Sequence, residues 1–131
     1  MKKFTINAEM CRKPIVNMAS GSVIASSFTP HYNKDTLTLE YISLALKDGD
    51  ILTVPFSALC FSNDVCTMVL VPETPFVPGK GRTSNLLGTP LSAVVGEYTL
   101  FTFGTIEATD VDENGSVISL LMADGKTYPI T

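Results

Sequence analysis

Ile42-Ser43-Leu44-Ala45-Leu46-Lys47-Asp48-Gly49 has a counterpart 76 residues later in Ile118-Ser119-Leu120-Leu121-Met122-Ala123-Asp124-Gly125. Both stretches carry an Ile-Ser-Leu triplet and, three residues further on, an Asp-Gly pair. A period near half of a 131-residue chain indicates two copies of one structural unit. The repeat is therefore the feature from which the fold is predicted.

Two further landmarks support the repeat. Lys13-Pro14-Ile15 returns at the same offset as Thr89-Pro90-Leu91, and each Asp-Gly pair leads to an apolar-flanked proline, Pro55 or Pro129. Between the copies, residues 72–81 hold three prolines and two glycines, a composition that favours an extended linker. We predict one unit over residues 1–71, a linker over 72–83 and a shorter unit over 84–131.

The alternation of apolar and polar residues predicts strands in both units. In the first, residues 36–44 and 51–54 flank a turn at Asp48-Gly49, a pair suited to tight hairpins. In the second, we expect strands at 100–108, 116–122 and 126–128, with turns at Asn114-Gly115 and Asp124-Gly125. The predicted fold is all-β: two small antiparallel β-barrels.

Helical patterns are weak, and only residues 55–59 and 84–87 are expected to form single helical turns. The repeated strands predict which side chains enter the core. These are Ile42, Leu44, Ile51, Ile118, Leu120 and Tyr128.

Composition excludes several classes of protein. Hydrophobic residues make up 45% of the chain and charged residues 17%, which is incompatible with disorder. The net charge is −4, and residues 83–131 hold one lysine against six acids, which argues against a phosphate backbone as ligand. The one basic cluster is predicted to be a solvated edge, with RNA association as an alternative; it comprises Lys2, Lys3, Arg12 and Lys13.

No stretch has the ~20 apolar residues of a membrane span, and the first residues are too polar for a signal peptide. The three cysteines are odd in number and lack metal-site spacing, which favours free thiols in the cytoplasm. Cys60 and Cys66 are expected on one continuous strand, too far apart for a disulfide.

Candidate sites for chemistry are few, and we expect no cofactor and no bound metal. His31 is the single histidine and is predicted to be an exposed loop residue, although a pair with Cys11, Cys60 or Cys66 stays open as an enzymatic alternative. Residues 110–115 resemble the first half of a calcium-binding loop, but Leu121 occupies the twelfth position, so a hairpin turn is favoured.

Both units resemble the PRC-barrel, the small β-barrel module named after the H subunit of the photosynthetic reaction centre. Leu86-Leu87-Gly88-Thr89-Pro90-Leu91 is similar to its opening, Gly104-Thr105-Ile106 to its Gly-x-Val step, and residues 118–129 to its final hairpin. The first unit departs from the pattern, since Arg12 and Ala25 stand where the module has glycine. The resemblance implies interaction rather than catalysis, because related modules bind other proteins.

The leading functional prediction is a non-enzymatic module of the bacterial cytoplasm that binds a protein partner or itself. The candidate interaction surface comprises Phe101, Phe103, Phe76, Lys3, Arg12 and Lys13. One alternative is a ligand-binding protein or enzyme with a pocket between the units, and another is an RNA- or ribosome-associated factor.

We also expect a two-fold dimer, because the second unit leaves an open sheet edge. Two intramolecular covers compete with a second subunit for that edge: the strand Lys3–Asn7 and the linker around Phe76.

Overall fold

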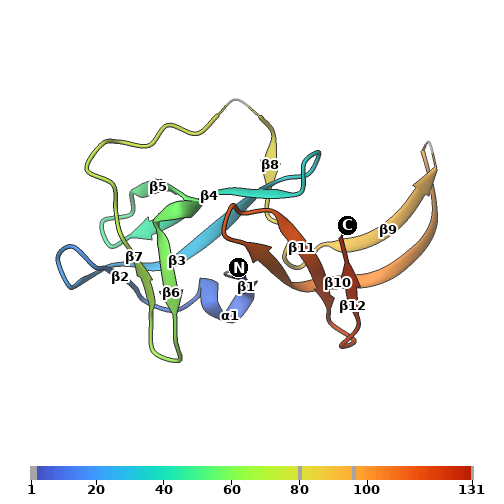
Figure 1. Ribbon diagram of the computed structural model, residues 1–131, viewed down its shortest axis with the longest axis horizontal. Helices are drawn as coiled ribbons and strands as arrows, with labels where there is room; N and C mark the ends of the chain where they lie inside the picture. Colours follow the sequence, from blue (N-terminus) through green and yellow to red (C-terminus); the bar gives the residue numbers. More distant parts are fainter. Residues whose placement is uncertain (1–2, 80, 96, 131) are drawn as a thin grey trace.

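The computed structural model describes residues 3–79, 81–95 and 97–130 of the chain. Its regular structure is almost entirely β-strand, in two curled sheets that lie side by side (Figure 1). The all-β prediction is confirmed. That the sheets are two copies of one barrel joined by a linker stays a prediction.

The larger sheet has seven strands in the spatial order β5-β4-β3-β2-β7-β6, with β8 paired to β3. Its strands are β2 (Ile15–Asn17), β3 (Ser22–Asn33), β4 (Thr38–Leu46), β5 (Ile51–Pro55), β6 (Leu59–Ser62), β7 (Thr67–Val69) and β8 (Thr83–Ser84). The pairing of β2 with β7 is parallel and the others are antiparallel. The predicted turn at Asp48-Gly49 joins β4 to β5, where the Gly49 amide donates to Leu46 O at 3.1 Å.

The smaller sheet has the order β1-β10-β11-β12, with β9 also paired to β10. Its strands are β1 (Lys3–Asn7), β9 (Pro90–Val95), β10 (Tyr98–Asp112), β11 (Val117–Met122) and β12 (Thr127–Pro129). The predicted turns at Asn114-Gly115 and Asp124-Gly125 join β10 to β11 and β11 to β12, and both glycines have positive φ.

The amino-terminal strand β1 belongs to this smaller sheet although it precedes the larger one in sequence. It pairs antiparallel with β10, from Lys3 opposite Asp112 to Asn7 opposite Ala108. The strand Lys3–Asn7, one of the two intramolecular covers considered from the sequence, thus pairs with this part of the β10 edge.

The repeated landmarks occupy equivalent places in the two sheets. Lys13-Pro14-Ile15 leads into β2, and Thr89-Pro90-Leu91 leads into β9. In the larger sheet β2, β3, β4 and β5 pair successively, and in the smaller sheet β9, β10, β11 and β12 do the same. The strand order is therefore the same over four successive strands.

The helical elements are short. The turn predicted at residues 55–59 is the 3₁₀ helix η1 (Phe56–Ala58), but the one at 84–87 is wrong, since Ser84 lies in β8 and a turn at Gly88 follows. The sequence prediction missed α1 (Ala8–Cys11), which the Asn7 side chain caps by accepting from the Met10 amide at 2.8 Å.

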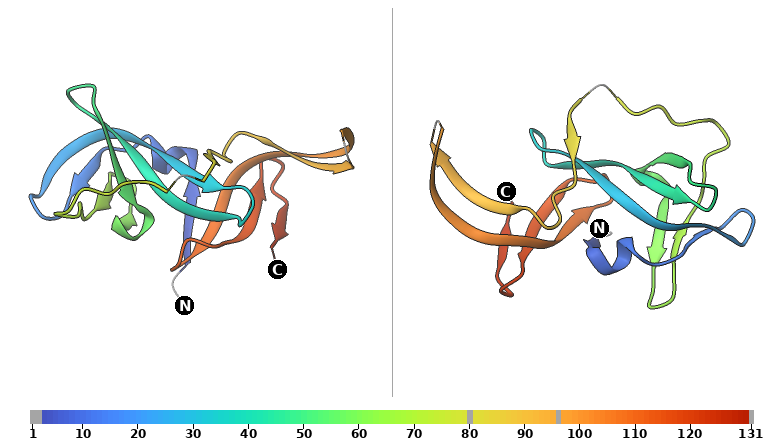
Figure 2. Two further views of the ribbon diagram at one scale, coloured as in Figure 1. Left: turned by 90° about the horizontal axis from the view of Figure 1, so that it is seen from above. Right: turned by 180° about the vertical axis from the view of Figure 1, so that it is seen from behind.

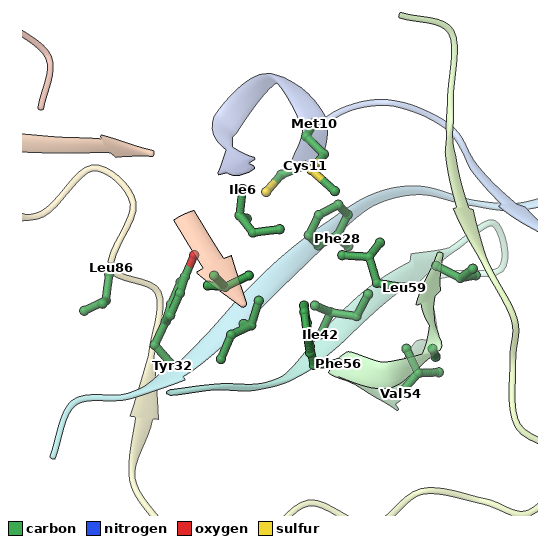
Figure 3. Close-up of a cluster of buried hydrophobic side chains, with 14 of the residues drawn as sticks. Ile6, Met10, Cys11, Phe28, Tyr32, Ile42, Val54, Phe56, Leu59 and Leu86 are labelled. Atoms are coloured by element: carbon green, nitrogen blue, oxygen red, sulfur yellow. The ribbon is translucent and has the colours of Figure 1, made fainter. Parts of the chain in front are cut away.

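Both sheets contribute to one hydrophobic core, part of which is shown in Figure 3. Of the predicted core residues, Ile42, Leu44 and Leu120 are buried. Ile118 and Tyr128 are half-buried. Ile51 is 72% exposed, so that prediction is wrong. Successive side chains of β5 face opposite sides of the sheet. Because Val54 faces the core, Ile51, three residues earlier, faces solvent.

The two sheets meet at a backbone joint between residues 37–39 and the turn before β11. Leu39 N donates to Gly115 O at 2.7 Å, and Val117 N donates to Leu37 O at 2.8 Å. Gly115 has φ +86°, and a Cβ there would lie 2.5 Å from Leu39 O. Only glycine fits this close approach.

Side chains reinforce the joint. The hydroxyl of Tyr32 (β3) lies 2.7 Å from that of Thr109 (β10), and both residues are fully buried. In Figure 3 the Tyr32 oxygen points away from its own strand, toward the other sheet. Phe4 of β1 packs edge to face against Phe56 at a ring-centroid distance of 5.7 Å. The hydrogen bond between the two hydroxyls satisfies both groups within the core.

We predict that Gly115→Ala destabilises the whole chain by about 2–5 kcal/mol, the sum of a left-handed backbone cost and an overpacking cost. Gly49→Ala is the matched control, because Gly49 also has positive φ but nothing lies within 4 Å of its Cβ position. It should cost only about 1–2 kcal/mol. Urea unfolding measures both, and equal losses would contradict the close approach.

Candidate functional site

The candidate site is a two-stranded arm, defined as β9 together with residues 98–105 of β10. The register of the arm runs from Val95 opposite Tyr98 to Pro90 opposite Thr105. The arm extends away from the body of the molecule in all three ribbon views (Figures 1 and 2). It is thus attached at its base and free along most of its length.

The arm is curled because β10 has extra residues, compared with β9, between the positions at which the two strands pair. The register shifts once between Thr99 and Phe101 and again between Thr102 and Gly104. Each shift is a bulge that bends its strand and increases the twist. Gly104, with φ +125°, accommodates the second shift, and its Cβ position lies 3.8 Å from Cε of Met122.

An aromatic row, defined as Phe101, Phe103 and Tyr128, connects the arm to β12. The Phe101 and Phe103 rings meet edge to face at 4.8 Å, and the Phe103 and Tyr128 rings meet at 5.6 Å. Phe101 is 59% exposed and Phe103 37%. The sequence predicted that the two phenylalanines share a face in the core or at a subunit contact. Core packing is wrong for Phe101, since most of its surface faces solvent.

Phe76 lies elsewhere in the molecule. It packs edge to face on Tyr41 of β4 at 6.0 Å, and it lies in the segment that follows β7 (Figure 1). The structure therefore does not bring Phe76 together with the aromatic row, and its ring packs on the larger sheet instead.

The predicted basic residues fall at three places. Lys3 begins β1 opposite Asp112. The Lys13 ammonium donates to Asn63 O at 2.5 Å, beside the turn between β6 and β7. Exposed Arg12 lines two hollows that both include Glu107, so it lies near the base of the arm. Lys2 lies outside the described residues.

His31 is not the exposed loop residue that the sequence predicted. It lies within β3, one residue before the two positions at which β8 pairs with that strand. Its Nε2 is 2.7 Å from Ser43 Oγ, its Nδ1 is 3.4 Å from Thr83 Oγ1, and its ring stacks on Tyr41 at 4.3 Å. Burial lowers the pKa of His31 below its ordinary value of 6.5. Both ring nitrogens are thus occupied by hydroxyl groups.

The cysteines carry no mark of activation. Cys60 and Cys66 do not share a continuous strand, because a turn at Asn63 folds β6 back on β7. The Cys60 thiol lies 3.5 Å from Ala58 O, and Cys66 Sγ lies 3.6 Å from the Met68 sulfur. Burial raises the pKa of Cys11 to about 12, the opposite of what a nucleophilic thiol needs.

A hollow of about 660 Å³ lies between the two sheets at the base of the arm. Its lining is mostly apolar, and Lys34 is the ionisable residue in it. The other lining residues are Leu37, Leu86, Thr89, Pro90, Leu91, Ser92, Ile106 and Leu120.

Metal-ligand clusters and membrane-spanning helices are both absent from the part of the chain that the structure describes. Among residues 3–79, 81–95 and 97–130, no three His, Cys, Asp or Glu side chains gather as metal ligands would. The calcium-like stretch forms a hairpin turn, in which Asp112 Oδ1 accepts from the amides of Asn114 and Ser116. The described part of the chain also holds no helix of the length and hydropathy needed to cross a membrane.

Comparison of the chain with protein-family models and with curated proteins found no match. The PRC-barrel resemblance therefore rests on the sequence motifs alone.

We predict a pH dependence of stability from His31. Because its pKa is lowered in the folded state, the unfolded chain takes up a proton first as the pH falls below about 6.5, which lowers the free energy of unfolding. His31→Gln should flatten the unfolding free energy between about pH 7.5 and 5.5 relative to the wild type. Thermal melts in that window would contradict this if the two profiles ran parallel.

Proposed function

We propose that the chain is a non-enzymatic interaction module that binds a protein through the aromatic row on the arm. The observation that carries the proposal is the exposure of Phe101 and Phe103 on an arm held away from the core. Aromatic side chains are enriched in protein interfaces and often dominate their binding energy.

The construction of the arm supports binding. A two-stranded hairpin is marginal in water unless a further strand or a packed face supports it. Beyond its base the arm has Tyr98 at 78% and Phe101 at 59% exposure, so it carries apolar surface that a partner would cover.

We also propose that each of the two sheets is a PRC-barrel-like unit. The equal order of four successive strands, β2-β3-β4-β5 and β9-β10-β11-β12, supports it together with the repeated motifs. The analogy with that family favours an interaction module, and the free thiols of Cys11, Cys60 and Cys66 favour the reducing cytoplasm.

The arrangement of ionisable groups favours this function over an enzyme. Among the described residues that line it, the hollow beside Lys34 has no carboxylate, histidine or thiol. A second hollow is lined by Cys11 and Glu107, and there burial raises the pKa of the thiol to about 12. The nitrogens of His31 lie near Ser43 and Thr83 rather than a nucleophilic sulfur.

Photo-crosslinking in cells tests the proposal. A benzophenone side chain in place of Phe101 should give a discrete adduct, and Phe103→Ser in the same chain should weaken it about tenfold, the loss of ~1.4 kcal/mol typical of an interface aromatic. Val65, 75% exposed at the turn before β7, is the matched control position. Equal adducts at both positions, or none at Phe101, would reject the aromatic row as the binding surface.

A further inference from the structure

We infer that the protein bound at the arm is a second copy of this chain, paired along the outer edge of β9 about a two-fold axis. This inference rests on the proposed function, because it names the partner that binds the arm. The pairing itself uses the outer edge of β9, and Phe101 lies on the neighbouring strand β10. It concerns the arm and not the β10 edge at residues 108–112, which β1 already occupies.

The outer edge of β9 offers backbone groups for pairing. Val95 and Tyr98 close the hairpin, and Thr89 O accepts from Ile106 N at 2.8 Å, so odd-numbered residues of β9 face β10. The amide and carbonyl groups of Ser92 and Val94 therefore point away from β10. Among the described residues β9 pairs with no strand on that side.

The edge also lacks the features that normally prevent pairing. From Pro90 to Val95 it contains no charged residue, and its proline stands at the first position, where it leaves Ser92 and Val94 unobstructed. Such an edge accepts another strand, and an identical edge brings no like charges into contact.

In the larger sheet, the strand that corresponds to β9 has a partner on both of its sides. β2 holds the place that β9 holds in the smaller sheet, and β7 pairs along its other side from Ile15 opposite Thr67 to Asn17 opposite Val69. The fold therefore places a strand against the first of the four successive strands in one sheet, and a second copy supplies it in the other.

An antiparallel two-fold pairing follows from the positions of the outward groups. Ser92 of one copy would lie opposite Val94 of the other, twice, and each such pair exchanges two N–H···O bonds. The axis then passes beside Ala93, and four arm strands form a continuous sheet. Phe101 and Phe103 of each copy then lie on β10, which is the outer strand of each half of this sheet.

Charge selects this orientation. Exposed Glu97 lies at the tip of the arm, and exposed Lys34 lines the hollow at its base together with Pro90 and Ser92. Antiparallel pairing brings the tip of each arm to the base of the other, so Glu97 approaches Lys34 twice. The two Glu97 residues remain roughly 25 Å apart at ~3.3 Å per residue, which keeps like charges separate.

A charge-swap series measured by sedimentation equilibrium tests the inference. The wild type should dimerise. Glu97→Lys and Lys34→Glu should each raise the dissociation constant about tenfold, since two pairs change from attraction to repulsion, and the double variant should restore it to within about twofold. The control variants Glu113→Lys and Lys47→Glu make the same charge changes at exposed turns and should leave dimerisation unchanged.

Ser92→Pro tests the edge itself, because it removes an outward amide that takes no part in pairing with β10. It should abolish the dimer at concentrations where the wild type is fully dimeric, with a far-ultraviolet spectrum that reports an intact fold. If that variant unfolds, the charge-swap series still decides. A dimer insensitive to the single charge reversals, or a double variant that is not restored, would overturn the antiparallel arrangement.

The outcome also separates the inference from the proposed function. A wild-type monomer at a hundred-micromolar concentration overturns self-pairing. If Phe101 crosslinks to a different protein in that case, the interaction module stands with another partner. If Phe101 gives no adduct, both are rejected.

Discussion

The close approach of Gly115 to Leu39 is the contact on which the arrangement of both sheets depends. It allows two backbone hydrogen bonds to join the turn before β11 to residues 37–39 at the start of β4, with Leu37 held at φ +51° beside them. The Tyr32 and Thr109 hydroxyls bond across the same boundary within the core. Units of about 65 residues are near the lower limit for an independent core, so the joint lets two small sheets share one.

The shared core explains why the arm can project. β1 precedes the larger sheet in sequence but pairs with β10 at residues 108–112, which ties this amino-terminal strand to the smaller sheet. β10 continues beyond that core toward its amino end, and there β9 is its one partner among the described strands. The strand that anchors the smaller sheet is therefore also the strand that carries Phe101 and Phe103 into solvent. The proposed binding surface and the shared core thus lie on different parts of one long strand.

Local features of the fold could be predicted from sequence and long-range ones could not. Asp48-Gly49 and Asn114-Gly115 predicted their turns because the pairs accept positive φ. Asn63-Asp64 is also a turn-forming pair, and its neglect led to the wrong continuous strand through Cys60 and Cys66. Ile51 was misplaced because alternation fixes which residues share a face but not which face is buried. The exposure of Phe101 depends on pairings about a hundred residues apart, such as Thr5 with Asp110, and no local pattern specifies them.

The central claim is that both sheets share one core and that the arm projecting from it pairs with a second copy. Amide hydrogen exchange at two protein concentrations tests this claim most directly. The account predicts that the Leu39 and Val117 amides are protected at both concentrations with the global free energy of unfolding. The Ser92 and Val94 amides should exchange rapidly in dilute protein and slow by the factor expected from dimer formation in concentrated protein. Rapid exchange of Leu39 and Val117 while the strands of both sheets stay protected would contradict the account, because the sheets would then be separate units.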